Sequence, residues 1–509
     1  MKYLIQRTQK IINILVIITA FMPYAQAQKI ERIYPTSPGA AYTDGHGIGF
    51  GFSVSIFENY ALMTARWANK IFAYKYNGTS WDQIQVLTYP LSKDPLEEPT
   101  GVDIDGQYAV IGRADYKKDS MYNYGAVSVY KRVGDSWSLK TTVMPSDLEG
   151  NSWFGEDVAI SGDYFVAGAS SKECAYVYKR SNESWNLVKK LTPSGGASGD
   201  QFGRRVAISD SGDYIIVGAR FHDNDEVDSG CAYIYLNSND SWSQVSKILP
   251  DDPARNAYFG SDVAISSNYA IVGAQSAIEA NGLNSGGVYV FKRNNATWTQ
   301  IQKITRSFNQ VNVLFGQSIS LSGDKIAIAA PGLDSIMTQD AGAVFVYQLN
   351  NDTFIPISQY YPTLFLDGYN RFGYDLDLHG NDLIIGNGGA SIDEYLSGEA
   401  YICKISTPHL DVSDMNSYQS PVSMTITSET DSNVTVFIES ENQSILPDTN
   451  IDISNSGSNN FVIDTQANIP VSFDTVFTPM ADEYGIVTLT ATVSDTSGNS
   501  NQYLFRLNS

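Results

Sequence analysis

Cysteine and basic residues are scarce in this chain of 509 residues. The sequence has 33 Lys and Arg against 55 Asp and Glu, a formal charge of −22. A nucleic-acid-binding surface is therefore not expected, because a phosphate backbone requires concentrated Lys and Arg. Three cysteines cannot form a disulfide framework. We expect them to be small buried residues, with one bridge as the alternative: Cys174, Cys231 and Cys403.

No apolar run is long enough to cross a membrane. The run from Ile11 to Phe21 has about 11 residues, whereas a spanning helix needs about 20. Three basic residues precede this run, and Ala25-Gln26-Ala27 follows it with the small-x-small pattern of a cleavage site. Residues 1–27 are therefore predicted to be a secretory signal peptide, with a buried N-terminal helix as the alternative. The mature chain is expected to be secreted or at the cell surface, without a transmembrane segment.

Catalytic signatures are also missing. The four histidines form no His-x-x-x-His pair, no Cys-x-x-Cys occurs, and there is no Gly-x-Ser-x-Gly motif. A zinc site and a serine nucleophile are therefore not predicted. Paired carboxylates for glycoside hydrolysis stay open, since spacing in sequence does not fix spacing in space. We expect no enzyme activity and no cofactor.

The chain instead contains an internal repeat. Phe-Gly recurs at residues 50, 154, 202, 259, 315 and 372, with Thr100-Gly101 in the remaining place. After each Phe-Gly comes a short alternating segment, a tight turn, a segment ending in Gly-Ala or Ala-Ala, and an aromatic segment such as Ala175-Tyr176-Val177-Tyr178. A fourth segment usually opens with Trp. Four strands in about 50 residues, seven times over, predict an all-β fold with a seven-bladed β-propeller over residues 28–405.

The seventh unit lacks its own fourth strand. Residues 29–35, Lys-Ile-Glu-Arg-Ile-Tyr-Pro, resemble the fourth-strand pattern Lys189-Lys190-Leu191-Thr192-Pro193. We expect the mature N-terminus to pair with the last blade and to close the ring, which removes exposed sheet edges. The strand tyrosines, which could in principle stack on sugars, are expected to pack between blades.

Phe-Gly, the ending Ala329-Ala330-Pro331 and the aromatic strand resemble the FG-GAP repeat of integrin α-subunit propellers. The resemblance implies extracellular recognition or adhesion. Repeats of this family often carry a calcium cage, Asp-x-Asp-x-Asp-Gly-x-x-Asp, in the first hairpin. Here that hairpin is reduced to Ser-Gly-Asp-Tyr, and only the incomplete Asp103-Ile104-Asp105-Gly106 remains. The family's calcium sites are therefore not expected.

One other loop alternates oxygen-bearing side chains. If a cation such as Ca²⁺ binds, Asp223, Asp225 and Asp228 are the predicted ligands, and the alternative is a solvated acidic loop. This loop belongs to a set of longer, variable connections that fall on one face of an antiparallel propeller. Because binding residues concentrate on loops carried by a rigid scaffold, that face is predicted to bind the partner. The connections are 115–124, 220–229, 250–258, 275–285, 307–314 and 332–340.

Asn-x-Ser/Thr sequons occupy the turns predicted for the opposite face. Glycosylation there depends on a eukaryotic secretory route, and Asn also suits such turns for backbone reasons. The predicted acceptors are Asn77, Asn182, Asn239, Asn295 and Asn351, with Asn433 and Asn442 in the C-terminal region.

The repeat stops near Lys404. Residues 409–509 contain no Trp or Cys and hold five strand-like runs, at 422–427, 434–439, 461–464, 471–473 and 487–493. These features predict a small β-sandwich, and the segment from Phe477 to Asp495 looks like the end of an Ig-like or cadherin-like module.

The sequence therefore favours a secreted or cell-surface interaction protein that binds an extracellular protein or glycan. The alternatives are a lectin or glycosidase-like propeller and an architectural surface-layer component. Trp81, Trp185, Trp242 and Trp298 superficially resemble the Trp of sialidase Asp-boxes, but the order Ser-x-Asp-x-Gly-x-x-Trp is not met.

Overall fold

The computed structural model describes two compact units, residues 28–407 and residues 408–509 with 1–27. Regular structure is almost entirely β-strand, with 3-10 helices η1 (Arg66–Ala68) and η2 (Ser170–Lys172). The described residues are 15–19, 30–35, 49–87, 98–278, 282–295, 297–306, 308, 310–334, 340–362, 371–392, 396–405, 422–427, 432–440, 451–453, 460–465, 471–477, 486–495 and 500–508.

Five sheets of the larger unit each consist of four consecutive antiparallel strands. Their strands are β7 (Gly101–Asp105), β8 (Tyr108–Arg113), β9 (Ala126–Val133) and β10 (Ser136–Val143); β11 (Val158–Ser161), β12 (Tyr164–Ala169), β13 (Cys174–Ser181) and β14 (Ser184–Leu191); β15 (Arg205–Ile208), β16 (Tyr214–Ala219), β17 (Cys231–Ser238) and β18 (Ser241–Ile248); β19 (Phe259–Ile265), β20 (Tyr269–Ala274), β21 (Gly287–Asn294) and β22 (Thr297–Ile304); β23 (Ile319–Ser322), β24 (Lys325–Ala330), β25 (Ala343–Asn350) and β26 (Thr353–Tyr360).

The remaining strands of this unit form one eight-stranded sheet. Its two halves meet at a single parallel pair, Gly398 with Phe50. The same one-residue contact joins neighbouring four-stranded sheets, as at Gly125 and Phe154. The halves are β3 (Phe50–Phe57), β4 (Tyr60–Ala65), β5 (Lys70–Tyr76) and β6 (Trp81–Leu87), and β27 (Leu376–His379), β28 (Asp382–Ile392), β29 (Leu396–Lys404) and β2 (Ile30–Ile33).

Glycine is needed at these junctions because the backbones approach closely. A Cβ atom on Gly125 would lie 2.1 Å from the carbonyl oxygen of Phe154, and one on Gly398 would lie 2.2 Å from that of Phe50. Both glycines also have a positive φ, which L side chains rarely adopt. The Phe of each junction is fully buried, as Phe50 and Phe154 show. The repeated Phe-Gly thus marks the place where each sheet begins against its predecessor.

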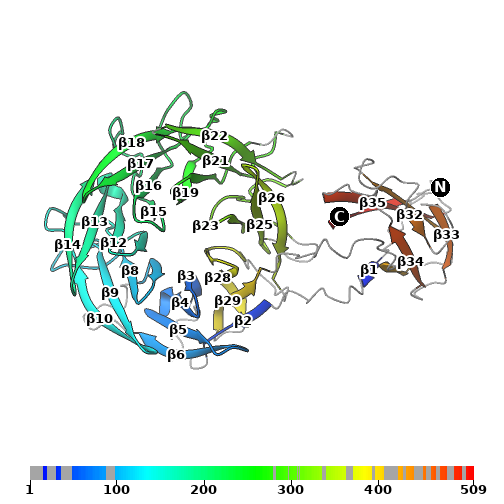
Figure 1. The fold of residues 1–509 in the computed structure, drawn as a ribbon, viewed down its shortest axis with the longest axis horizontal. Helices are drawn as coiled ribbons and strands as arrows, with labels where there is room; N and C mark the ends of the chain where they lie inside the picture. The colour runs from blue at the N-terminus through cyan, green and yellow to red at the C-terminus, as the bar shows by residue number, and fades with distance from the viewer. Residues whose placement is uncertain are drawn as a thin grey trace, which may run out of the picture. The chain divides into compact units, whose positions relative to one another are not determined.

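The N-terminal strand β2 pairs antiparallel with β29, with Ile30 opposite Cys403 and Ile33 opposite Ala400. It lies at the outer edge of its sheet, as β6 and β26 do in theirs (Figure 1). The backbone N–H of Trp81 donates to Glu31 Oε1 over 2.8 Å. Elsewhere Trp137 N–H donates to Gln85 Oε1 at the same distance, so β2 makes the contact that the outer strand of another sheet makes.

Aromatic side chains pack the sheets together. Trp185 at the start of β14 makes an edge-to-face contact with Tyr108 of the preceding sheet, at a centroid distance of 5.8 Å. Trp242 and Tyr164 repeat this contact at 5.7 Å, and Trp298 and Tyr214 at 5.6 Å. The tyrosines of the third strands are buried, which confirms that they are core residues rather than exposed stacking platforms: Tyr176, Tyr178, Tyr233, Tyr235 and Tyr289. All three cysteines are buried and free, as expected.

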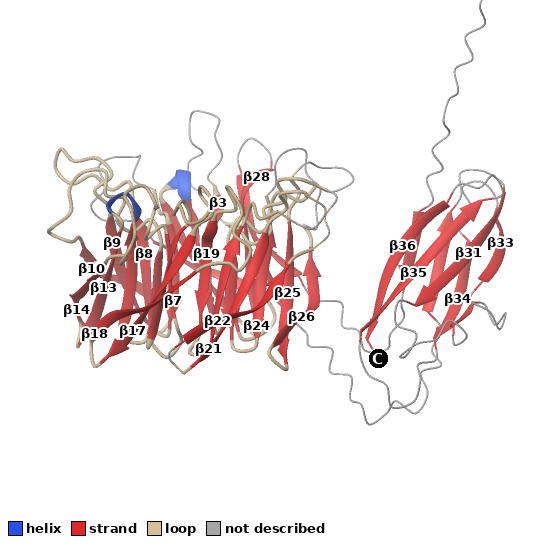
Figure 2. Cartoon of the chain, turned by 90° about the horizontal axis from the view of Figure 1, so that it is seen from above, coloured by secondary structure: helices blue, strands red, loops and turns tan. Residues whose placement is uncertain are grey.

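Long loops and tight turns lie at opposite ends of the strands. Figure 2 shows the longer described loops and both 3-10 helices along one end of the larger unit, with short hairpin turns along the other. We call the first end the loop face and the second the turn face.

The second unit contains two four-stranded sheets, β1-β30-β34-β32 and β33-β31-β35-β36. The five predicted runs fall in β30, β31, β33, β34 and β35, whereas β32 and β36 were not predicted. The predicted leader lies mostly outside the described residues, and its described part, Leu15–Thr19, is a strand that pairs with β30. The bounds are β1 (Leu15–Thr19), β30 (Val422–Thr427), β31 (Ser432–Ser440), β32 (Ile451–Ile453), β33 (Asn460–Thr465), β34 (Val471–Phe477), β35 (Ile486–Asp495) and β36 (Ser500–Asn508).

Candidate functional site

The first strands of the sheets surround a central cavity of about 610 Å³. Side chains on a strand alternate between its two faces, so every second residue of these strands can face the centre. Near β27, for example, Leu376 and Leu378 are buried in the core, whereas Asp375 and Asp377 stand at the alternate positions. The cavity is therefore lined by polar side chains that recur from one sheet to the next.

Much of this polar lining connects one sheet to the next. A Ser or Asp on the first strand of one sheet, or directly before it, accepts a hydrogen bond from a backbone N–H of the neighbouring first strand. The carboxylates therefore have a structural role, since each satisfies a backbone donor that would otherwise face the cavity. The pairs are Val102 N with Ser53 Oγ (3.2 Å), Ile160 N with Asp103 Oδ2 (2.7 Å), Val206 N with Asp157 Oδ2 (2.8 Å), Ile319 N with Asp262 Oδ2 (2.6 Å), Leu376 N with Ser318 Oγ (3.2 Å) and Val54 N with Asp375 Oδ2 (2.9 Å).

Arg205 interrupts this pattern. It occupies the position in β15 where the neighbouring sheets carry Asp157 and Asp262, and its Nε atom lies 3.4 Å from Asp262 Oδ1. Burial disfavours the charge of Arg205, but the carboxylates of Asp157 and Asp262 outweigh that effect and raise its pKa. The cavity thus places the half-buried Arg205 among acids.

Burial is the largest influence on the pKa values of these cavity acids. It raises the pKa of Asp262 to about 8 and that of Asp375 to about 6. It also raises the pKa of Asp103, and the nearby Asp377 adds to that rise. Ser55 Oγ lies between these two carboxyl groups, 3.1 Å from Asp103 Oδ1 and 3.0 Å from Asp377 Oδ2. At neutral pH part of this ring therefore carries protons, and it presents both donors and acceptors of hydrogen bonds.

Toward the loop face the cavity is lined by aromatic and charged side chains, which we call its mouth: Phe52, Arg66, Trp153, Glu156, Arg204 and Tyr374. The rings of Phe52 and Tyr374 are 5.1 Å apart between centroids, and the guanidinium carbon of Arg66 lies 4.4 Å over the Phe52 ring. Arg204 Nη1 donates to Glu156 Oε1 over 2.5 Å. Trp153 is 36% exposed.

Five of these six mouth residues flank a Phe-Gly pair. Phe52, Glu156, Arg204 and Tyr374 directly follow one, and Trp153 directly precedes one. The buried Phe-Gly fixes the backbone at each junction, and the flanking residues differ from repeat to repeat at the edge of the cavity. Sequence reasoning missed them as a site, although comparison of the positions next to each Phe-Gly would have found them.

The loop predicted to bind a cation is the next candidate site. Within the described part of the chain, no three His, Cys, Asp or Glu side chains are grouped so that they could bind a metal ion. Asp223, Asp225 and Asp228 are therefore not brought together as ligands. Asp223 Oδ1 instead accepts the backbone N–H of Asp228 over 2.8 Å, which shapes the loop.

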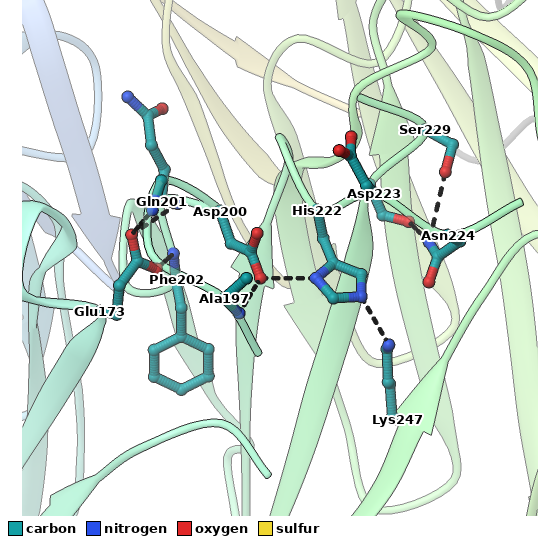
Figure 3. Close-up of polar contacts among 12 residues, drawn as sticks. Glu173, Ala197, Asp200, Gln201, Phe202, His222, Asp223, Asn224, Ser229 and Lys247 are labelled. Atoms are coloured by element: carbon teal, nitrogen blue, oxygen red, sulfur yellow. Dashed lines mark hydrogen bonds and ion pairs between the residues drawn. The ribbon is translucent and has the colours of Figure 1, made fainter. Parts of the chain in front are cut away.

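A buried chain of polar groups that the sequence did not reveal lies beside this loop (Figure 3). His222 Nδ1 is 2.5 Å from Asp200 Oδ2, and Lys247 Nζ is 2.7 Å from His222 Nε2. Asp200 also accepts the N–H of Ala197. Lys247 can only donate, so His222 accepts at Nε2 and donates from Nδ1 to Asp200. These hydrogen bonds connect the loop after β16 to β18.

The sequons of the larger unit lie in exposed turns of the turn face. Asn182, Asn239, Asn295 and Asn351 have φ between 46° and 56°. Asn77 differs, because its Oδ1 accepts the N–H groups of Thr79 and Ser80. Each Asn therefore has a conformational reason for its place. The side chain of Asn433, in β31, and all of Asn442 lie outside the described residues.

The model of the FG-GAP repeat matches four tandem segments, residues 137–178, 185–235, 242–291 and 298–347. No curated protein sequence matches the chain. Similar solved structures include U3-55K (10% identity, TM-score 0.46, 74% of this chain and 99% of that one) and the RRP9 WD40 repeats (10% identity, TM-score 0.47, 76% and 99%). Another is a functionally unknown protein from Desulfotomaculum acetoxidans DSM 771, at 14% identity and TM-score 0.42, covering 61% and 84%.

The chain thus contains tandem FG-GAP repeats within an all-β unit of repeated four-stranded sheets. Among the described residues, none of the helices has the length and apolar character that a membrane span requires.

Proposed function

We propose that the chain is a secreted or cell-surface recognition protein that binds an extracellular ligand through the loop face of a seven-bladed propeller. The count of seven treats the eight-stranded sheet as two blades, because Gly398 and Phe50 join its halves by the single bridge that joins separate sheets elsewhere. Strand β2 supplies the outer strand of the last blade. The FG-GAP repeats support this reading, since such propellers often take part in ligand or adhesion interactions.

The distribution of exposed apolar side chains carries the proposal. Thirteen large hydrophobic residues are exposed among the described residues. Three of them lie on outer strands and one, Val133, on the turn face. The other nine lie in connections of the loop face, so exposed apolar side chains are concentrated at that end of the strands: Tyr34, Trp67, Tyr122, Trp153, Val227, Leu249, Ile278, Val311 and Tyr361.

Recognition rather than catalysis is proposed because four aspartates of the cavity already accept backbone N–H groups of neighbouring sheets. Export would follow from cleavage of residues 1–27, and the C-terminal unit would act as an Ig-like spacer. These parts of the proposal rest on the sequence pattern. N-terminal sequencing of protein recovered from the medium tests the cleavage after Ala27.

Binding of the fluorescently labelled chain to intact cells of its source tests the recognition surface. Trp67→Ser with Val311→Ser should reduce binding at least tenfold, because these changes remove exposed apolar contacts without affecting the core. Val133→Ser with Val245→Ser is the matched control, since these residues are also exposed but lie on the turn face and an outer strand. Equal loss in both variants, or in neither, would contradict the proposal.

A further inference from the structure

The cavity mouth combines aromatic faces with opposite charges that are already paired. Arg204 pairs with Glu156, and Arg66 forms an ion pair with Glu98. Deeper in the cavity, Arg205 lies beside Asp262. A polyanion would meet Glu156 and the aspartates, and a polycation would meet the arginines. The arrangement therefore favours a neutral ligand rich in groups that both donate and accept hydrogen bonds.

Hydroxyl groups have this property. The lining of the cavity contains guanidinium and serine donors together with carboxylate acceptors, among them Arg204, Ser53 and Asp375. A hydroxyl can donate to a carboxylate and accept from a guanidinium at the same time. A cavity of about 610 Å³ lies within the range of roughly 300–1,000 Å³ found for small-ligand sites.

The aromatic residues supply flat apolar surfaces at the same entrance. Phe52 and Tyr374 lie together on one side, with Arg66 over Phe52. Trp153 precedes the sheet of β11 and remains 36% exposed. Aromatic rings with one solvent-facing surface suit the C–H face of a sugar ring, which combines an apolar face with a polar edge.

We propose that the mouth of the central cavity binds the end of a neutral saccharide chain, with Tyr374 and Trp153 against sugar rings and the Arg204–Glu156 pair on ring hydroxyls. This inference rests on the proposed recognition function and names the ligand class of the same face. It assigns binding and no bond cleavage.

Calorimetry on the full chain tests the inference with defined probes. The neutral probes are maltotetraose, cellotetraose, xylotetraose, mannotriose and triacetylchitotriose, and the acidic probes are trigalacturonate and a heparin tetrasaccharide. At least one neutral probe should bind and should change the tryptophan fluorescence. That change should be absent in Trp153→Phe if Trp153 contacts the sugar.

Mouth variants locate the binding. Tyr374→Leu and Arg204→Gln should each weaken the affinity at least tenfold. Val133→Ser and Arg255→Gln are the controls, because both residues are exposed but do not line the cavity. If Arg204→Gln fails to fold, Glu156→Gln tests the same ion pair, and it keeps the size of the Glu156 side chain. Thermal midpoints identify the folded variants.

Three results would overturn the inference: no neutral probe binds the folded chain, only acidic probes bind, or the mouth variants bind as well as the controls. The recognition function is judged separately. If cells are still bound by Tyr374→Leu and no saccharide competes, the saccharide inference fails and the recognition function remains. If the Trp67 and Val311 variant binds cells normally, the recognition surface fails whatever the probes show.

Discussion

The backbone N–H of Trp81 donates a 2.8 Å hydrogen bond to the side chain of Glu31, and this bond joins the outer strand β6 to the N-terminal strand β2. On the other side of β2, Arg32 forms an ion pair with the buried Glu399 of β29. The first described residues of the larger unit therefore bridge the two halves of the eight-stranded sheet. A short segment at one end of the chain thereby affects the stability of the whole ring.

Ile33→Ala tests this closure. Ile33 is 3% exposed and packs in the cluster that contains Phe50 and Ile402. Loss of its side chain should lower the free energy of unfolding by about 2–5 kcal/mol, the range for buried large-to-alanine changes. Tyr34→Ala is the control, since that side chain is 57% exposed and only its carbonyl oxygen accepts from Tyr74. Urea titration measures both, and equal effects would contradict a role for β2 in closure.

The ring of buried acids should make stability fall as the pH rises. Burial raises the pKa of Asp262 to about 8 from an ordinary value of 3.8. The folded state therefore binds one more proton than the unfolded state between about pH 4 and pH 8. Over that window the free energy of unfolding should decrease by at most about 1.4 kcal/mol per pH unit from this group.

Asp262→Asn removes that titration and keeps an oxygen near the N–H of Ile319. The pH dependence should become shallower between pH 4 and pH 8, as measured by urea unfolding at several pH values. Asp225→Asn is the control because Asp225 is exposed on the loop after β16. An unchanged slope in Asp262→Asn would show that this carboxyl group does not retain its proton in the folded chain.

Asp200 and Lys247 both form a hydrogen bond with His222, so replacement of His222 should lower the free energy of unfolding. His222→Leu leaves the buried Asp200 without its side-chain partner, which typically costs about 3–5 kcal/mol. His222→Gln should cost clearly less, because an amide can donate to Asp200 and accept from Lys247. Equal losses in the two variants would indicate that packing volume, rather than hydrogen bonding, is what matters there.

Metal removal should leave the chain unaffected. The loop with Asp223, Asp225 and Asp228 is shaped by the bond from Asp228 N–H to Asp223, and this bond needs no ion. The thermal midpoint should therefore be the same in EDTA and in millimolar CaCl₂. A rise of several degrees in calcium that disappears in Asp223→Ala would restore the predicted cation site.

The repeat made much of the fold predictable because each signal was local. Three features recur with a period of about 50 residues: Phe-Gly, the small residues at the end of the second strand and the Trp near the start of the fourth. Each reflects a packing constraint at one position of the repeat. In the C-terminal unit, β36 was missed because its run Tyr503-Leu504-Phe505 is short and follows an Asn- and Ser-rich segment.

The candidate site was not predictable in the same way. Phe52 and Tyr374 belong to the first and last repeats and meet only because the ring closes. Arg205 looks like an ordinary charged residue in sequence, and its raised pKa follows from Asp157 and Asp262 on the neighbouring sheets. Contacts of this kind depend on which strands become neighbours, and no single repeat contains that information.

The sequon asparagines can be tested for their backbone role without any sugar. Asn239 and the following Asp240 have φ of 53° and 68°, the left-handed pair of a tight hairpin. In protein made without glycosylation, Asn239→Gly should leave the free energy of unfolding nearly unchanged, whereas Asn239→Val should lower it by about 1–2 kcal/mol. Asp240 also pairs with Lys179 of the preceding sheet, so strain at this turn should weaken a contact between sheets. If valine is tolerated as well as glycine, the turn does not explain the asparagine, and attachment of a glycan becomes the better reason for its presence.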